Sequence, residues 1–213
     1  MPQNTIIILN GHLQDKVNKY KKLIPKNAFL LAADGGALLL RKIGFLPHTI
    51  IGDMDSLSEK NLKYFNKKNI KLIRYPVEKD ETDAELALDY CWRNNLNNII
   101  ITGALGGRFD QQMANIFLLE YASKLNLKAV IKEPGLEIGL VKEKKLFENK
   151  NGFKLSLMPI DDIVKNVFIK GCKYKLDGKD LCRHKTRGIS NKITNKKAVV
   201  EKEKGNLLYV LTE

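Results

Sequence analysis

Short, continuous apolar runs alternate with segments whose apolar residues recur at helical spacing through the first two thirds of the chain. The apolar runs cover residues 5–9, 28–33, 49–51, 70–75, 98–102 and 127–132. The helical patterns between them end near Leu23, Gly44, Lys68, Cys91 and Leu125. Continuous apolar strands separated by amphipathic helices are typical of a parallel sheet that helices cover on both faces. We therefore predict an N-terminal α/β domain.

The pattern changes beyond about residue 136. Short strand-like runs follow one another at residues 136–141, 153–158, 164–169, 196–201 and 207–211. Turns separate these runs, and none of the segments between them has the spacing of an amphipathic helix. This pattern predicts a second, all-β domain, either a sandwich or a small barrel. We place the boundary within residues 134–145 and divide the chain into domains 1–138 and 139–213.

Composition narrows the class of protein. The chain has 213 residues, and it contains no apolar run of the roughly 18 residues that a transmembrane helix needs. The N-terminal residues lack the basic and apolar segments of a signal peptide. The three cysteines are odd in number and lack C-x-x-C spacing, which argues against a disulfide framework or a zinc site. We expect a cytoplasmic protein without a membrane partner.

The formal net charge is +13. Its basic residues are mostly lysines, and they are spread along the whole chain instead of forming one block. We therefore do not expect a nucleic-acid partner, although such a charge invites that interpretation. The excess of positive charge can still attract anionic substrates such as nucleotides.

The polar and glycine-rich segments that stand out all follow predicted strands. They are Asn10-Gly11, Asp34-Gly35-Gly36, Asp53 to Ser56, Lys79 to Asp83 and Gly106 to Gln111. In an open parallel sheet, the ligand crevice lies outside the carboxyl ends of the strands. A Walker A sequence is absent, and the three histidines, at positions 12, 48 and 184, give no plausible Ser-His-Asp set. Acids, glycine turns and one arginine are typical of metal-assisted phosphoryl chemistry.

Asp53 and Asp55 are separated by one residue at the end of an apolar strand. If the chain stays extended there, both carboxylates point to the same side, and Mg²⁺ is a suitable ion to lie between them. The alternative is a loop of solvated acids before a helix that Ser56 and Glu59 cap. Asp83 is a candidate third ligand, or an acid that the helix dipole favours in a first turn.

Three further segments allow two interpretations each. Gly106-Gly107 can bring backbone N–H groups close to phosphate oxygens, or it can form an ordinary glycine turn. Arg108 can bind phosphate through its guanidinium fork, or it can form a surface ion pair with Asp110. Asp34-Gly35-Gly36 can contact a nucleotide, or it can simply end a strand before a helix.

These motifs together resemble a known family. A-D-G-G-A (33–37), G-D-M-D-S (52–56), D-E-T-D (80–83) and G-G-R-F-D-Q (106–111) have the order and spacing found in thiamine pyrophosphokinases. In the C-terminal half, residues 171–176 resemble the G-x-x-Y-x-L strand of that family, and residues 187–191 resemble its G-x-S-N turn. The ordered set covers nearly the whole chain and is far more specific than any single motif.

The resemblance implies an enzyme with an α/β catalytic domain and a β-sandwich domain. Such enzymes transfer a pyrophosphoryl group from ATP to the hydroxyl of thiamine, giving thiamine diphosphate and AMP. They work as homodimers with the active site between subunits. The resemblance assigns Mg²⁺ binding to Asp53, Asp55 and Asp83, and an acidic catalytic role to Asp110. It implies ATP contacts for Asp34, Gly35, Gly36, Lys79, Thr82, Arg108 and Gln111.

In the second domain, the resemblance implies that Ser190 and Asn191 help to hold thiamine, where a plain Asx or Ser turn is the alternative. The chain departs from the family pattern at three positions. Lys192 replaces a common Glu, Glu81 replaces a common Lys, and Gln111 stands where many bacterial members have His. Two other functions stay open. One is a pyrophosphokinase for another hydroxyalkyl heterocycle such as a pterin, and the other is a non-catalytic protein that binds nucleotides or nucleic acid.

Overall fold

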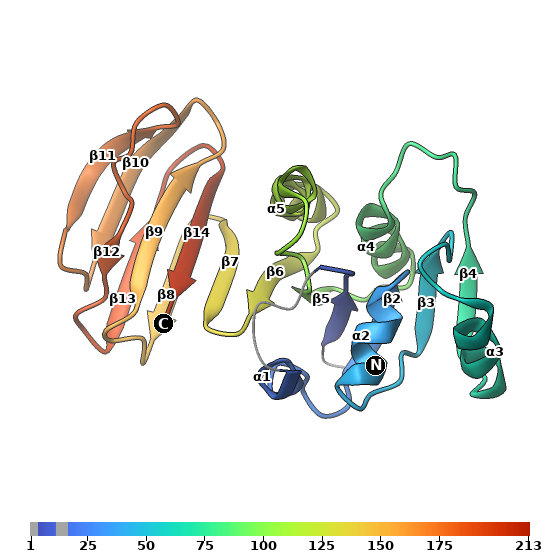
Figure 1. The fold of residues 1–213 in the computed structure, drawn as a ribbon. Coiled ribbons are helices and arrows are strands. Elements are labelled where there is room, and N and C mark those ends of the chain that lie inside the picture. The colour runs from blue at the N-terminus through green and yellow to red at the C-terminus, as the bar shows by residue number, and fades with distance from the viewer. Residues whose placement is uncertain (1–3, 12–16) are drawn as a thin grey trace. The chain divides into compact units, whose positions relative to one another are not determined.

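The computed structural model describes residues 4–11 and 17–213, and the chain divides into two compact units between Pro134 and Gly135. The division falls at the start of the predicted boundary range. A boundary at residue 138 would cut strand β7 (Leu136–Val141). In Figure 1 all labelled helices lie in the first unit, which also contains strands, and the second unit has strands alone. The predicted combination of an α/β unit and an all-β unit is confirmed.

The strands of the first unit pair in parallel in the order β6-β5-β1-β2-β3-β4. They are β1 (Thr5–Ile8), β2 (Phe29–Ala33), β3 (Thr49–Gly52), β4 (Lys71–Arg74), β5 (Asn98–Thr102) and β6 (Lys128–Glu133). The central strands are apolar on both faces because helices cover both. Ile6 and Ile8 face one side and Ile7 faces the other, and all three are buried.

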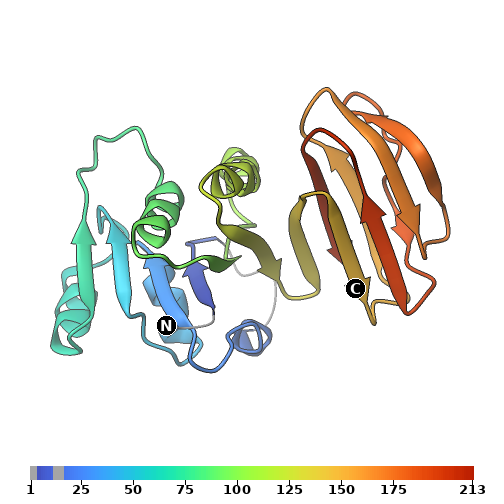
Figure 2. The same cartoon turned by 180° about the vertical axis from the view of Figure 1, so that it is seen from behind.

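Two groups of helices cover the sheet, as Figures 1 and 2 show. One face carries α1 (Val17–Lys21), α2 (Gly36–Lys42) and α3 (Glu59–Lys67), and the other carries α4 (Asp83–Arg93) and α5 (Phe109–Lys124). The helix predicted to end near Leu23 corresponds to α1, but residues 12–16 lie outside the described residues. Within the described residues, no helix is long and apolar enough to cross a bilayer.

Side-chain caps begin two of these helices. The Thr82 hydroxyl accepts a hydrogen bond from the Glu85 N–H at the start of α4, as the sequence predicts. The prediction of Ser56 as the cap of α3 is wrong. The cap is Ser58, whose hydroxyl accepts from the Asn61 N–H. The Ser56 hydroxyl instead donates to Asp55 Oδ1 at 3.2 Å.

The order of the strands creates a switch point between β1 and β5. From β1 the chain proceeds outward to β2, β3 and β4, and from β5 it proceeds the other way to β6. The loops after β1 and β5 therefore leave in different directions from neighbouring strand ends. They stay connected by hydrogen bonds from Leu9 N–H to Thr102 O and from Gly11 N–H to Gly103 O, each 2.9 Å. Such a point is where open α/β sheets bind ligands.

The second unit is a β-sandwich of two antiparallel sheets. One sheet has the order β12-β9-β14-β7 and the other β11-β10-β13-β8. Their strands are β7, β8 (Lys144–Glu148), β9 (Lys154–Pro159), β10 (Ile163–Lys170), β11 (Leu176–Cys182), β12 (Asn191–Lys192), β13 (Lys197–Glu201) and β14 (Leu207–Thr212). Inward-facing residues of both sheets, among them Leu157 and Tyr209 from one and Val164 and Val200 from the other, share one core.

The sequence misplaced parts of this unit. Strand β8 was not predicted, because its Lys144 and Lys145 obscure the alternation that buries Phe147. Residues 171–175 do not form the strand that the family resemblance implies. Cys172 instead makes an isolated bridge to Ile193, and regular pairing starts only at Leu176. The turn predicted around residues 187–190 is confirmed, and it leads directly into β12.

Candidate functional site

A pocket of about 360 Å³ lies at the carboxyl ends of the strands in the first unit. The loops after β1, β2, β3 and β5 and the first turns of α4 and α5 form its walls. The lining residues with polar side chains are Asn10, Asp34, Asp53, Asp55, Ser56, Thr82, Asp83, Gln111 and Asn115. Gly11, Gly103 and Gly106 contribute backbone to the same walls. The strand-end segments that the sequence singled out thus come together around one cavity.

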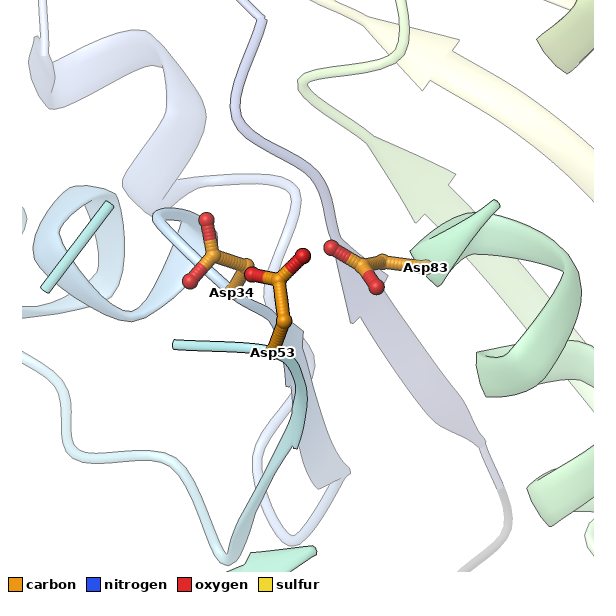
Figure 3. A group of neighbouring side chains, drawn as sticks. All are labelled: Asp34, Asp53 and Asp83. Carbon is orange, nitrogen blue, oxygen red and sulfur yellow. The ribbon is translucent and has the colours of Figure 1, made fainter. Parts of the chain in front are cut away.

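Three carboxylates converge in this pocket, as Figure 3 shows. Asp34 follows β2, Asp53 follows β3 and Asp83 begins α4, and one oxygen from each lies within 4.8 Å of the other two. The three residues are far apart in the sequence, and only the parallel sheet brings their strand ends together. Oxygen ligands at this spacing suit a hard divalent cation such as Mg²⁺.

The environment of the acids favours a bound cation. Asp34 is 6% exposed, and its Oδ1 is buried without a hydrogen-bond partner in the described part of the chain. Burial raises the pKa of Asp34 and also that of Asp83. The pKa of Asp53 is lowered, chiefly because the backbone N–H of Asp55 donates to its carboxylate. Two of the three acids are therefore held at an electrostatic disadvantage that a cation would relieve.

Lys79 supplies part of the missing positive charge. Its Nζ lies 3.3 Å from Asp53 Oδ2 and 3.2 Å from Asp83 Oδ1. The contact with Asp83 is an ion pair by distance, although its geometry is not that of a hydrogen bond. One ammonium beside three carboxylates leaves two formal negative charges when all three are ionised. This balance fits a divalent ion held by the same acids.

Gly52 makes room for the acid cluster. Its φ of +139° is a conformation that side-chain-bearing residues rarely adopt. A Cβ at this position would lie 3.0 Å from Asp83 Oδ2 and 3.2 Å from Asp34 Cβ. The glycine of the G-D-M-D-S motif thus allows the end of β3 to pass between two of the carboxylates.

Asp55 does not lie where the sequence predicts. The prediction assumes an extended chain, but Met54 has a φ of +69°, and the Asp55 N–H turns back to donate to Asp53 Oδ1 at 3.0 Å. The assumption of an extended chain between the two acids is therefore wrong, and Asp55 does not belong to the cluster of three carboxylates. Asp34, which the sequence assigned to ATP, takes the third place in the cluster. Asp55 is exposed and lines the same pocket.

Gly35 and Gly36 allow the start of α2 to pack closely against the end of β1. A Cβ on Gly36 would lie 2.1 Å from Ile8 O, and one on Gly35 would lie 2.4 Å from Asn10 Nδ2. These glycines hold Asp34 and Asn10 next to each other at the pocket wall. The structure thus gives them a packing role, and their predicted contact with ATP stays a prediction.

Arg108 and Asp110 form the surface ion pair that the sequence allows as an alternative. Arg108 Nε lies 3.2 Å from Asp110 Oδ1, and both side chains are largely exposed. The hydrogen bond from Arg108 lowers the pKa of Asp110. Neither side chain lines the pocket, whereas Gln111, the next residue of α5, does.

Ser190 and Asn191 belong to the second unit. The Asn191 side chain is buried; its Oδ1 accepts from Tyr174 N–H at 3.0 Å, and its Nδ2 donates to Tyr174 O at 2.6 Å. Asn191 therefore holds the 171–175 segment against β12. Ser190 is exposed with a φ of +57°, and its N–H donates to Ser156 Oγ. Asn191 thus has a structural role in β12 that is not a local Asx turn, whereas Ser190 is exposed in the turn before β12.

Sequence reasoning missed two residues at this site. Asn115 lines the pocket four residues after Gln111, so the helical spacing of α5 contained a signal for it. Asn10 was predicted at the crevice, although without a role of its own, and it lines the pocket. Glu133 lies behind the pocket wall, and a single acid at the end of a strand gives no sequence signal at all.

Comparisons with known proteins agree with this architecture. Residues 20–131 match the family model described as thiamin pyrophosphokinase, catalytic domain, and residues 144–207 match thiamin pyrophosphokinase, vitamin B1 binding domain. The thiamine pyrophosphokinase of Bacillus subtilis is 27% identical over 208 residues, which is 97% of each chain. The crystal structure of a Bacillus subtilis thiamine pyrophosphokinase has a TM-score of 0.86 at 26% identity and covers 98% of both chains.

The crystal structure of yeast thiamin pyrophosphokinase has a similar fold, with a TM-score of 0.82 at 21% identity, and covers 99% of this chain and 86% of its own. The two family models fall on the two structural units, one on each side of Pro134. The acid cluster and its pocket lie within the span of the catalytic model. This chain therefore belongs to the thiamin pyrophosphokinase family.

Proposed function

We propose that the protein transfers a pyrophosphoryl group from ATP to the hydroxyl of thiamine in a Mg²⁺-dependent reaction that gives thiamine diphosphate and AMP. The observation that carries this proposal is the convergence of Asp34, Asp53 and Asp83 in the switch-point pocket of a thiamin pyrophosphokinase fold. A pocket with a concentrated negative charge and glycine-rich walls suits a metal–polyphosphate complex better than a bare anion.

Asp53 and Asp83 are the proposed metal ligands common to the sequence and the structure. Asp34 completes the set in this arrangement, and Asp55 lines the same pocket within reach of the bound polyphosphate. When bound, Mg²⁺ neutralises phosphate charge and the charge that develops on the leaving oxygen. The protein's own contribution is to hold the carboxylates at the ends of two strands and the start of α4, so that their spacing is fixed before substrate binds.

Backbone and side-chain donors around the acids would hold the nucleotide. Gly106 lines the pocket with backbone, and the side chains of Thr82 and Gln111 line it from the starts of two helices. Lys79 already bridges two of the acids and can contact a phosphate oxygen at the same edge. Arg108 can leave its exposed ion pair with Asp110 at little cost, because pairs in water are weak.

In the proposed reaction, the thiamine hydroxyl attacks the β-phosphorus of ATP, and AMP leaves with the bridging oxygen. The hydroxyl proton passes to a carboxylate, for which the family resemblance suggests Asp110. Its pKa is lowered by Arg108, so it is a weak base. Loose phosphoryl transfer requires little from the base, because most of the catalysis comes from positioning and charge stabilisation.

We further propose that the second unit binds thiamine through the turn at Ser190 and that the enzyme is a homodimer. The match of residues 144–207 to a vitamin B1 binding domain supports the first point. Exposed aromatic side chains support the second. Phe109 is 75% exposed and Phe117 is 50% exposed, two turns apart on α5. Apolar surface of this kind favours contact with another chain.

³¹P NMR of the protein with ATP, Mg²⁺ and thiamine tests the reaction directly. We expect AMP and a thiamine diphosphate signal, neither of which forms without thiamine. ADP as the product would mean transfer of the γ-phosphoryl group and would contradict the proposal. A parallel reaction with a hydroxymethyl pterin tests the acceptor, since turnover with the pterin alone would replace thiamine as the substrate.

A further inference from the structure

A buried acid lies behind the pocket wall, outside the carboxylate cluster. Glu133 ends β6 and is 4% exposed. Its Oε1 accepts hydrogen bonds from the backbone N–H groups of Ala104 at 2.9 Å and Leu105 at 3.4 Å. Within the described residues, Oε2 is buried and accepts no hydrogen bond. A buried carboxylate is unfavourable unless it is paired, so the burial of Glu133 needs a reason.

The segment that Glu133 holds is the loop after β5, residues 103–107, which we call the β5 loop. Other elements hold it as well. Gly11 N–H donates to Gly103 O at 2.9 Å, and Asn115 Nδ2 donates to Ala104 O at 2.8 Å. Three consecutive residues of this loop are therefore fixed from β6, from α5 and from the end of β1.

This arrangement divides the backbone donors of the β5 loop into two sets. The N–H groups of Ala104 and Leu105 are directed to Glu133. Those of Gly106 and Gly107 donate to no acceptor in the part of the chain that the structure describes. Both glycines have a positive φ, +89° and +84°, and Gly106 lines the pocket. Successive free N–H groups in such a conformation suit a phosphate oxygen.

We propose that Glu133 is a positioning residue for the polyphosphate of the nucleotide. It fixes the β5 loop through Ala104 and Leu105, so that the free N–H groups of Gly106 and Gly107 are presented to phosphate. This inference rests on the proposed function and extends it to a residue that does not touch the substrate. No family motif quoted from the sequence includes Glu133.

The reach of the Glu133 side chain matters more than its charge in this account. Burial raises the pKa of Glu133, although the hydrogen bond from Ala104 N–H acts in the opposite direction. Glutamine has the same length and keeps one acceptor oxygen, whereas aspartate keeps the charge but is shorter by one methylene. Comparing the two substitutions therefore shows whether the length of the side chain or its charge is needed.

The test compares Glu133→Gln, Glu133→Asp and Glu133→Ala with wild type in the full-length protein. We expect Glu133→Gln to keep KM for ATP within about twofold of wild type, while Glu133→Asp and Glu133→Ala raise it by about 10-fold or more. KM for thiamine should change little. Backbone amides of residues 103–107 should exchange with deuterium faster in the Asp and Ala variants and at the wild-type rate in the Gln variant.

Tyr121→Phe is the matched control. It removes a side-chain hydrogen bond in the same unit, from the Tyr121 hydroxyl to Asp89 at 2.6 Å, without touching the β5 loop. It should affect the unfolding temperature but not KM for ATP. If Glu133→Ala fails to fold, the Gln and Asp variants still decide the question.

The inference is overturned if Glu133→Asp matches wild type while Glu133→Gln does not, because charge would then matter and reach would not. It is also overturned if Tyr121→Phe and Glu133→Ala raise KM for ATP equally. A wild-type protein that does not turn over ATP would contradict the proposed function instead. In that case, unchanged amide exchange in Glu133→Ala would separately refute the role of Glu133 in holding the β5 loop.

Discussion

Acids occur in two contrasting settings in this protein. On the sheet β11-β10-β13-β8 of the second unit, Asp180 and Glu201 lie at the surface and each pairs with one lysine. Lys165 Nζ lies 2.6 Å from Asp180 Oδ2, and Lys144 Nζ lies 2.7 Å from Glu201 Oε1. In each pair the lysine lowers the pKa of the acid. In the pocket of the first unit, three acids lie together and one lysine pairs with two of them, Asp53 and Asp83. Burial raises the pKa of Asp34 and Asp83.

The two settings distinguish acids that surface lysines neutralise from acids whose negative charge the fold leaves partly unpaired. Exposed pairs neutralise each other in water, contribute little to stability and need no ligand. The pocket holds like charges together at a free-energy cost that only a positively charged ligand can offset. A charge that the fold leaves unbalanced is therefore a stronger indication of function than the number of acids. The predictions below test this contrast.

The largest expected effect is on catalysis. Asp53→Asn keeps the size of the side chain but removes a charge from the cluster, so turnover should fall by about 100-fold or more while the protein stays folded. The matched control is Asp180→Asn, which removes an exposed acid from a lysine pair and should leave turnover unchanged. Steady-state kinetics with ATP and thiamine measure the turnover of both variants. Equal turnover would mean that the pocket acid matters no more for catalysis than the paired surface acid.

A smaller effect is expected from crowding the cluster. Gly52→Ala places a methyl group 3.0 Å from Asp83 Oδ2, so the carboxylates must move apart. We expect the Mg²⁺ concentration for half-maximal activity to rise by about 10-fold, as when the support of a metal ligand is disturbed. Gly44→Ala is the control, because Gly44 also has a positive φ of +86° but an added Cβ would meet no atom within 4 Å. A similar rise in both variants would attribute the effect to backbone strain alone.

The smallest expected effect is on stability. Asp34→Asn removes repulsion from the metal-free pocket and should stabilise the protein at pH 7 by roughly 1 kcal/mol while activity falls. Because the folded-state pKa of Asp34 is raised above its ordinary value of 3.8, ionisation destabilises the fold at all pH values above the folded-state pKa. The penalty is relieved as the pH falls and Asp34 becomes protonated.

Urea unfolding of wild type and Asp34→Asn across the acidic range measures this difference, with EDTA present throughout. The advantage of the asparagine variant should be largest near neutral pH and should shrink as the pH falls. An advantage that grows on acidification would mean that Asp34 is stabilised as a carboxylate, contrary to its burial beside Asp53 and Asp83.

The sequence was sufficient to predict the two units, all six strands of the parallel sheet and the edge of the sheet where the pocket lies. These features depend on periodicity and on the rule that parallel strands bring their carboxyl ends to one edge. The α4 cap at Thr82 was equally local, since it depends on residues three apart. Local patterns made Asp53 and Asp83 candidate metal ligands, the family resemblance assigned them that role, and the structure brings their carboxylates together.

What the sequence could not supply depends on turns and on contacts between distant residues. The left-handed turn at Met54 leaves Asp55 outside the acid cluster, and Met is a residue that rarely adopts that conformation. Asp34 joins the cluster only because β2 and β3 are neighbours in register. Glu133 reaches the β5 loop from 29 residues away at Ala104. None of these features leaves a pattern in the chain.

Binding of Mn²⁺, followed by the electron paramagnetic resonance signal of the free ion, tests the central claim most directly. Mn²⁺ takes the same oxygen ligands as Mg²⁺ and reports binding without turnover. The account predicts saturable binding by wild type and by Asp180→Asn, and its loss in Asp53→Asn and Asp83→Asn. If wild type and Asp53→Asn remove the same amount of Mn²⁺ from solution, the three carboxylates are not a cation site.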